Sequence, residues 1–173
     1  MSRTENDTVS RRALGRMAGP LLCGLLVGLH TPQALAHGFK AGGVHIDHPY
    51  APPTLAGTTQ GAVYFRSMSN KGPSADRLVQ AHTGVAGTVE IHRMALDAGV
   101  MRMRAVDAID LPVGMAVSTR HDQGDGYHLM LRDVKTPLKE GDRFTLRLRF
   151  EQAGWQDVVV WVQNPRKRAA HAH

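Results

Sequence analysis

Histidines and methionines recur in this sequence at spacings that would let them share a metal ion. Six of them fall into three short groups: His92 and Met94, Met101 and Met103, and His128 and Met130. A thioether is a poor ligand for zinc, calcium or magnesium but a good ligand for Cu(I), and imidazole suits copper as well. The residue types therefore predict a soft-metal site, with copper as the ion.

Strand alternation places one of these groups on a single face. Within residues 127–131, His128 and Met130 alternate with leucines and a tyrosine, and side chains two positions apart in a strand point the same way. The leucines would then face the core, while the imidazole and the thioether lie close enough to share one ion. The plain alternative is that a methionine fills a gap in the core, which is the role we expect for Met68 and Met115.

A short turn brings the other two groups together. The turn signal Asp97-Ala98-Gly99 predicts a hairpin that folds Met101 or Met103 back toward His92 and Met94. If this hairpin lies beside the strand that carries the His-Leu-Met group, two imidazoles and one or two thioethers come together. The hairpin is therefore the element that must position the site.

Short alternating runs, separated by turn residues, dominate the chain beyond its first 36 residues. The clearest run is 143–150, in which apolar and polar residues alternate with the period of a half-buried strand. Further strands are predicted at residues 43–48, 61–67, 77–81, 88–94, 101–106, 115–120, 127–131 and 157–162. Seven to nine short strands favour an all-β Greek-key sandwich or barrel.

The first 36 residues are typical of an export signal. Arg11 and Arg12 form a twin-arginine pair, an apolar stretch covers residues 17–29, and Ala34-Leu35-Ala36 offers a cleavage site. A Sec-type signal would look similar, so both export routes stay open. Because the apolar stretch is too short to span a bilayer, we expect a periplasmic protein with no membrane span after cleavage near Ala36.

Cleavage would leave one β-domain at residues 37–164 and a basic tail at 165–173. The formal net charge would fall from +6 to +4, and this excess is spread along the strands without a nucleic-acid motif. We therefore expect neither nucleic-acid binding nor, in the absence of a catalytic constellation, enzymatic activity. The single cysteine, Cys23, lies within the expected signal, so the exported chain would have no thiol.

The motif and the text around it resemble the periplasmic PCu(A)C copper chaperones, a family of cupredoxin-like domains that bind Cu(I). The family motif is a histidine and a methionine with ten residues between them, followed later by His-x-Met. Here ten residues separate His92 from Met103, and His128-Leu129-Met130 supplies the closing part. The 24 residues between Met103 and His128 exceed the usual spacer slightly, and the surplus fits the glycine-bearing stretch 121–126.

The resemblance implies a set of Cu(I) ligands: His92, Met103, His128 and Met130, with Met94 and Met101 as additional methionines beside them. It also implies that the protein delivers Cu(I) toward cytochrome c oxidase subunit II, with a Sco-type thiol copper protein as a partner. A blue-copper electron carrier would need a cysteine thiolate, which the exported chain would lack. A cupredoxin-like fold here would therefore hold and pass on copper.

Three histidines outside the motif are secondary candidates. His37 would begin the exported chain, where its amine and imidazole could chelate Cu(II), although an incidental histidine at a chain end is the simpler interpretation. His171 and His173 on the tail could capture a second ion, as Cu(II), and present it to the main site. Two other functions stay open: a periplasmic copper-buffering or resistance protein, and a structural β-sandwich without metal.

Overall fold

The computed structural model describes residues 38–117, 119 and 126–164, and all regular secondary structure in these residues is β. The strands are β1 (Gly38–Ala41), β2 (Val44–Ala51), β3 (Gly61–Asn70), β4 (Asp76–Thr83), β5 (Thr88–Asp97), β6 (Val100–Ala105), β7 (Ile109–Leu111), β8 (Ala116–Val117), β9 (Gly126–Arg132), β10 (Arg143–Phe150) and β11 (Gly154–Val162). The predicted all-β fold is confirmed. The described part has two strands more than the upper predicted number, because β1 and β7, with four and three residues, are too short to show an alternating pattern.

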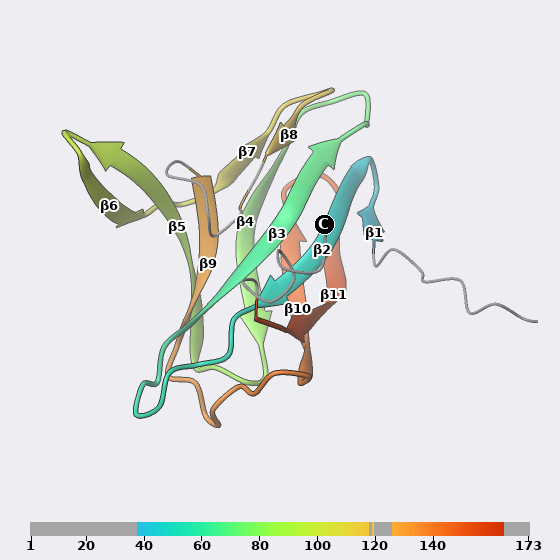
Figure 1. Ribbon diagram of the computed structural model, residues 1–173. Helices are drawn as coiled ribbons and strands as arrows, with labels where there is room; N and C mark the ends of the chain where they lie inside the picture. Colours follow the sequence, from blue (N-terminus) through green and yellow to red (C-terminus); the bar gives the residue numbers. More distant parts are fainter. Residues whose placement is uncertain (1–37, 118, 120–125, 165–173) are drawn as a thin grey trace, which may run out of the picture. The chain divides into compact units, whose positions relative to one another are not determined.

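The strands follow the order β6-β5-β9-β3-β2-β11-β10-β4-β7, with β1 beside β2 and β8 beside β3. Every strand pair is antiparallel except β2 with β11. Strand β3 joins two halves of this order: β6, β5 and β9 on one side, and β2, β11, β10, β4 and β7 on the other. Residues 61–63 of β3 pair with β9, whereas residues 64–70 pair with β2. In Figure 1, β6, β5 and β9 lie on the left, β2, β10 and β11 on the right, and β3 crosses between them.

The hydrophobic core lies between these two halves. In β10, alternate residues are buried, so that Phe144, Leu146, Leu148 and Phe150 point inward and the residues between them are exposed. They belong to the same buried cluster as Leu129 and Leu131 of β9 and Val158, Val160 and Val162 of β11. Full burial of one such side chain contributes about 1.5–3 kcal/mol. Because the β9 leucines are committed to this core, the other face of β9 is left for polar and sulfur-bearing side chains.

A buried carboxylate ties β4 to the turn between β10 and β11. Asp76, which is 5% exposed, accepts hydrogen bonds from the backbone N–H groups of Arg77, Gln152 and Ala153 at 2.7, 2.9 and 3.0 Å. Buried polar groups need such partners, because an unmade hydrogen bond leaves the cost of desolvation uncompensated. Asp76 therefore has a structural role, away from the histidine and methionine groups.

Candidate metal centre

Strands β5 and β9 lie side by side and set the inner part of the site. Their antiparallel register places His92 directly opposite His128, and Glu90 opposite Met130. Residues directly opposite each other on neighbouring strands carry their side chains on the same face of the sheet. Leu129, which lies between His128 and Met130 along β9, is buried in the core. Both imidazoles and the Met130 thioether therefore belong to the outer face.

The hairpin between β5 and β6 is closed by a two-residue turn. Its central residues, Ala98 and Gly99, have φ values of +48° and +81°, which is the pattern of the type I′ turn that matches the twist of two antiparallel strands. Asp97 and Arg102 form an ion pair at 3.0 Å across the end of the hairpin. The hairpin predicted from the sequence is confirmed.

The register of this hairpin decides which side chains meet. Met103 lies opposite Met94, and Met101 lies opposite Leu96. Strand alternation then puts both β6 methionines on the same outer face as the imidazoles. We call this surface the ligand face; its sulfur- and imidazole-bearing members are His92, Met94, Met101, Met103, His128 and Met130.

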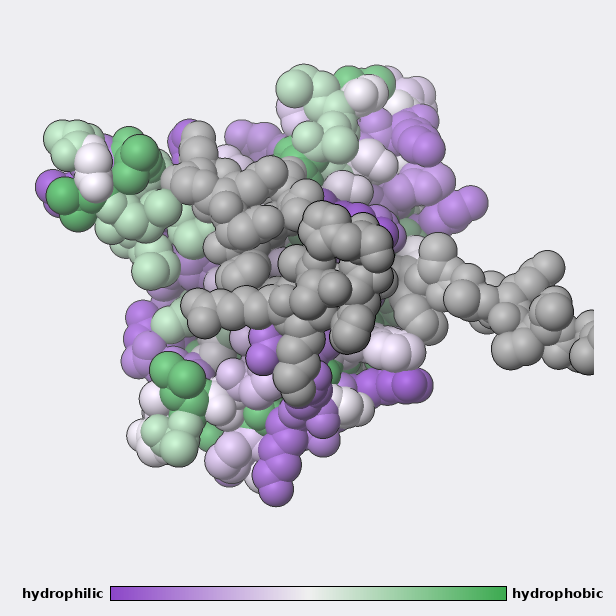
Figure 2. Space-filling view, viewed as in Figure 1, coloured by the Kyte–Doolittle hydropathy of each residue, from purple (hydrophilic) through white to green (hydrophobic). Residues whose placement is uncertain are grey.

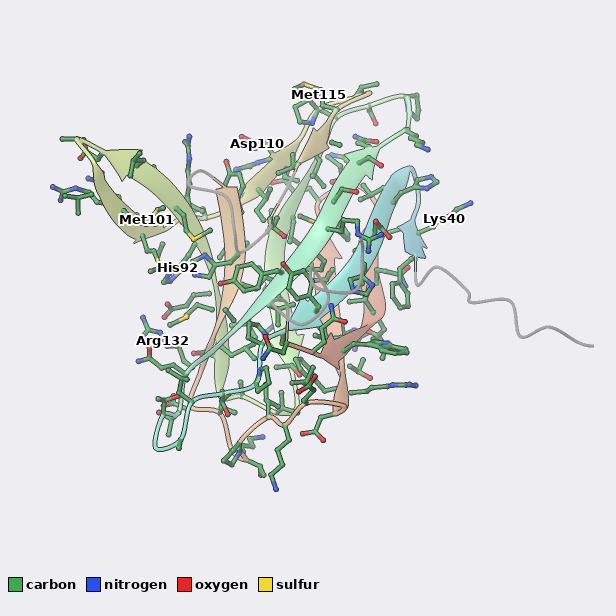
Figure 3. The ribbon with its side chains drawn as sticks, viewed as in Figure 1. Lys40, His92, Met101, Asp110, Met115 and Arg132 are labelled. Atoms are coloured by element: carbon green, nitrogen blue, oxygen red, sulfur yellow. The ribbon has the colours of Figure 1, made fainter. Side chains whose placement is uncertain are left out.

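Exposure rises along the ligand face from the imidazoles to the hairpin. His128 is 2% exposed and His92 8%, whereas Met101 and Met103 are 43% and 60% exposed. Figure 3 shows His92 near the base of the hairpin and Met101 further out along it. Figure 2 shows apolar side chains gathered on the projecting hairpin, which carries the exposed Leu96 among others. The site thus has a buried imidazole pair and an open methionine edge.

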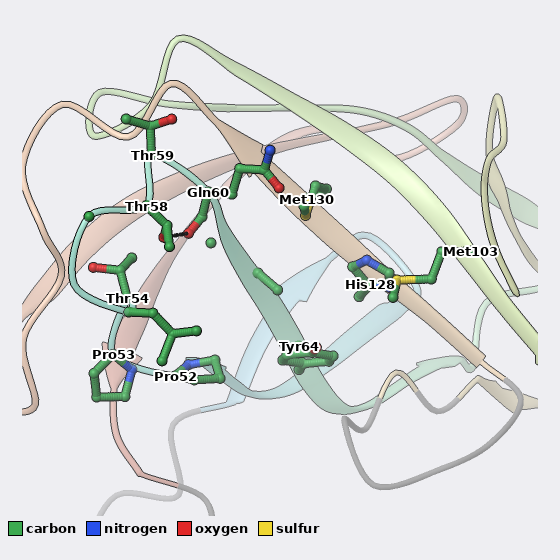
Figure 4. Close-up of a pocket in the computed structure, with 14 residues that line it drawn as sticks. Pro52, Pro53, Thr54, Thr58, Thr59, Gln60, Tyr64, Met103, His128 and Met130 are labelled. Atoms are coloured by element: carbon green, nitrogen blue, oxygen red, sulfur yellow. Dashed lines mark hydrogen bonds between the residues drawn. The ribbon is translucent and has the colours of Figure 1, made fainter. Parts of the chain in front are cut away.

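The two imidazoles are in ring contact. Their centroids are 5.3 Å apart and their planes meet at 65°. The ring of Tyr64 in β3 also packs against His128, with centroids 5.9 Å apart. Tyr64, His128, Met103 and Met130 all line one pocket of about 680 Å³, together with the loop between β2 and β3. Figure 4 shows this pocket with the Met103 side chain beside His128. A ligand in it would meet nitrogen and sulfur together.

One nitrogen of His128 lacks a partner within the described residues. Its Nδ1 atom is buried and makes no hydrogen bond to any of them. Burial, and after it the charge of the neighbouring His92, lowers the pKa of His128 from 6.5 to about 4. The ring is therefore neutral at physiological pH, the form in which imidazole binds metals. This unpartnered nitrogen could serve as a ligand to a soft metal ion, so the residues fit copper.

The second imidazole is held by a carboxylate. His92 Nε2 lies 2.8 Å from Glu90 Oε2, and Arg132 Nε donates to the same oxygen at 3.2 Å. The hydrogen bonds from His92 and then from Arg132 lower the pKa of Glu90, which keeps this carboxyl group ionised. Figure 3 shows Arg132 below His92 on the same side of the sheet. The imidazole pair is thus asymmetric, with one ring anchored and the other unpartnered at Nδ1.

Comparison with known proteins places this geometry in a family. Residues 44–162 match the family described as "Putative lipoprotein LpqE-like". The chain belongs to the LpqE-like family. Among the curated relatives of this LpqE-like chain is "Putative lipoprotein Lxx21020" of Leifsonia xyli subsp. xyli, which is 28% identical over 138 residues, or 79% of this chain and 80% of the relative.

Solved structures confirm the resemblance to PCu(A)C domains and the cupredoxin-like fold. The copper-bound PCuAC domain from PmoF2 is 26% identical to the LpqE-like chain, with a TM-score of 0.62 over 75% of this chain and 99% of that domain. The solution structure of CuI-DR1885 from Deinococcus radiodurans is 22% identical, with a TM-score of 0.55 over 76% and 84% of the two chains. This second likeness concerns the fold alone.

The LpqE-like fold brings all six motif side chains to one face. Secondary candidates His37, His171 and His173 lie outside the described residues, as do the expected export signal and most of the 121–126 loop. Met68 is fully buried, as expected, whereas the expectation for Met115 was wrong, because this side chain is 58% exposed. It follows the two-residue turn after β7 and lies outside the core.

Two neighbours of the site were missed in the sequence. Glu90 could have been found, since it stands two positions before His92 and so shares its face. Tyr64 could not, because its contact with His128 depends on the pairing of β3 with β9.

Within the described ranges, no group of three or more His, Cys, Asp or Glu side chains is arranged to hold a metal ion. The same ranges contain no helix long and apolar enough to cross a membrane.

Proposed function

We propose that this LpqE-like protein is a periplasmic copper chaperone that binds Cu(I) and passes it on. The proposed ligands are His92, Met103, His128 and Met130, with Met94 and Met101 as additional thioethers. The observation that carries the proposal is the buried, unpartnered Nδ1 of His128 on a face that also presents methionine sulfur. Mixed imidazole and thioether ligands favour Cu(I) over harder ions.

A copper-bound structure supports the choice of metal. The PmoF2 domain, with 26% identity, is described as copper-bound. Neither sulfur nor nitrogen in the proposed ligand set carries a negative charge, so the bound ion would keep its positive charge. No thiolate is available to hold it against a better-ligated site, since the sequence has one cysteine, Cys23, in the expected signal. We infer that the role is transfer of copper and neither redox catalysis nor another enzymatic reaction.

The exposure of the ligands favours delivery over storage. Met103 is 60% exposed on the edge strand β6, so an incoming ligand from another protein could reach copper there by displacing a thioether. A protein that sequesters copper would gain from full enclosure of the ion. We therefore place delivery, toward the copper centres of cytochrome c oxidase and with a Sco-type protein as partner, ahead of buffering.

Export belongs to the same proposal. The twin-arginine pair and the cleavage site at Ala36 support it, and the family and a curated relative are described as lipoproteins. The additional Cu(II) site considered at His171 and His173 forms no part of this proposal, since those residues lie outside the described structure.

Two experiments test the proposal. X-ray absorption at the copper edge of the Cu(I)-loaded protein is expected to show both sulfur and imidazole nitrogen around the ion, and a shell of nitrogen and oxygen alone would contradict the ligand set. A deletion strain grown at low copper is expected to lose cytochrome c oxidase activity and to regain it with added copper. Unchanged oxidase activity together with copper hypersensitivity would instead indicate buffering.

A further inference from the structure

Glu90 stands at the centre of a small charged network beside the proposed copper ligands. Its Oε2 atom is 2.8 Å from His92 Nε2 and 3.2 Å from Arg132 Nε. Glu90 and His92 are two positions apart on β5 and share the ligand face, while Arg132 reaches the same oxygen from β9. The Glu90 carboxylate therefore contacts the proposed copper ligand His92 without being a proposed ligand itself.

The network fixes which nitrogen of His92 carries the proton. A carboxylate paired with arginine is ionised, and an ionised carboxylate accepts hydrogen bonds but cannot donate them. His92 Nε2 must therefore be the donor, and in the neutral form of the ring the lone pair is then on Nδ1. In His128 the Nδ1 atom is buried and has no hydrogen-bond partner among the described residues. With Nε2 of His92 held by Glu90, Nδ1 is the nitrogen that either ring would offer to a metal.

We propose that Glu90 is a positioning residue that holds His92 in its Nε2–H tautomer and so presents Nδ1 to Cu(I). Carboxylate–histidine–metal arrangements of this kind orient the ring and make the metal-binding nitrogen more basic. The carboxylate also places a negative charge near an ion whose proposed ligands are all neutral. This inference rests on the proposed function, because it concerns the copper ligand His92.

The chain offers a matched control for the charge and the arginine contact. Glu151 forms a similar pair with Arg77 at 3.0 Å, and its side chain is 39% exposed against 41% for Glu90. The side chain of Glu151 accepts its hydrogen bond from Arg77 Nη1, where Glu90 accepts from His92 and Arg132. Glu151→Leu therefore removes an equivalent surface carboxylate that is paired with Arg77, whereas Glu90→Leu removes the one that holds the imidazole.

The first measurement is the tautomer of His92 in the copper-free full chain, by ¹⁵N correlation of the imidazole nitrogens. We expect a protonated Nε2 and an unprotonated Nδ1 in the parent and in Glu151→Leu. Glu90→Leu should give a mixture of the two tautomers, while Glu90→Gln should retain the Nε2–H form because its amide oxygen can still accept. An unchanged tautomer in Glu90→Leu, or a protonated Nδ1 in the parent, would overturn the proposal.

The second measurement is Cu(I) affinity for the same four proteins under anaerobic conditions. Glu90→Leu is expected to weaken binding by about 10-fold to 100-fold, the usual effect of losing such a partner, with Glu90→Gln between it and the parent. On loading, the Nδ1 resonance of His92 should shift strongly; a shift confined to Nε2 would contradict the assignment. A parent that binds no Cu(I) would refute the proposed function, whereas the copper-free tautomer decides separately whether Glu90 fixes the ring.

Discussion

His128 combines burial, ring contact and an unpartnered nitrogen in one side chain. Its pKa is lowered to about 4 by burial and then by the charge of His92, so it needs to release no proton when copper binds at neutral pH. His92, in contrast, is tied to Glu90. At the scale of residues, the site therefore combines the His128 ring, whose Nδ1 is available to bind a metal ion, with the His92 ring, whose orientation is set by Glu90.

This difference predicts a pH dependence of stability. The unfolded chain protonates His128 below about pH 6.5, whereas the folded protein does so only near pH 4. Between these values the unfolded state binds more protons, so the free energy of unfolding falls as the pH falls. The loss should reach at most about 3 kcal/mol, measured by urea denaturation from pH 7 to pH 4. His128→Leu should remove this part of the slope; an identical slope in the variant would argue against it.

At the scale of elements, the β5–β6 hairpin carries the methionine edge. The hairpin was predictable from the Asp97-Ala98-Gly99 turn signal, although its register, which puts Met103 opposite Met94, was left open between Met101 and Met103. The side of the sheet followed from the alternation of leucines with His128 and Met130. The pairing of β5 with β9 was only a supposition, because 24 residues separate Met103 from His128 and local patterns do not define such contacts. For the same reason the contact of Tyr64 with His128 was not foreseen.

The turn itself can be improved or damaged in a predictable way. Ala98 has a φ of +48° and Gly99 a φ of +81°, a region that asparagine and glycine tolerate better than alanine. Ala98→Asn should therefore raise the free energy of unfolding by about 0.5 kcal/mol, and Gly99→Ala should lower it by about 1 kcal/mol. Urea denaturation of the copper-free protein measures both. Equal stability of the two variants would mean that the hairpin does not contribute to the cooperative unit.

At the scale of the whole molecule, stability and copper binding rest on different residues. The core lies between the two halves of the sheet, and Asp76 links β4 to the β10–β11 turn through three backbone N–H groups. The alternation in residues 143–150 predicted β10 from end to end. In contrast, Met115 was misplaced, because a single methionine has no periodic context that tells core from surface.

Asp76→Ala should separate the two properties. It leaves three backbone donors without their acceptor, so we expect a loss of about 2–3 kcal/mol in the free energy of unfolding. Under conditions where the variant is folded, its Cu(I) stoichiometry and affinity should match those of the parent, since Asp76 does not touch the ligand face. Loss of copper binding in the folded variant would show that the site depends on the contact between β4 and the β10–β11 turn.

The central claim is that copper binds on the ligand face through both imidazole and thioether groups. Anaerobic competition for Cu(I) against a chromophoric chelator tests it most directly, with the parent, His128→Leu, Met103→Leu and the matched control Met115→Leu, whose methionine is 58% exposed against 60% for Met103. We predict one Cu(I) per parent chain, affinity reduced by about 10-fold or more in His128→Leu and Met103→Leu, and parent-like affinity in Met115→Leu. A parent that does not compete for Cu(I), or site variants that bind as tightly as the parent, would contradict the claim.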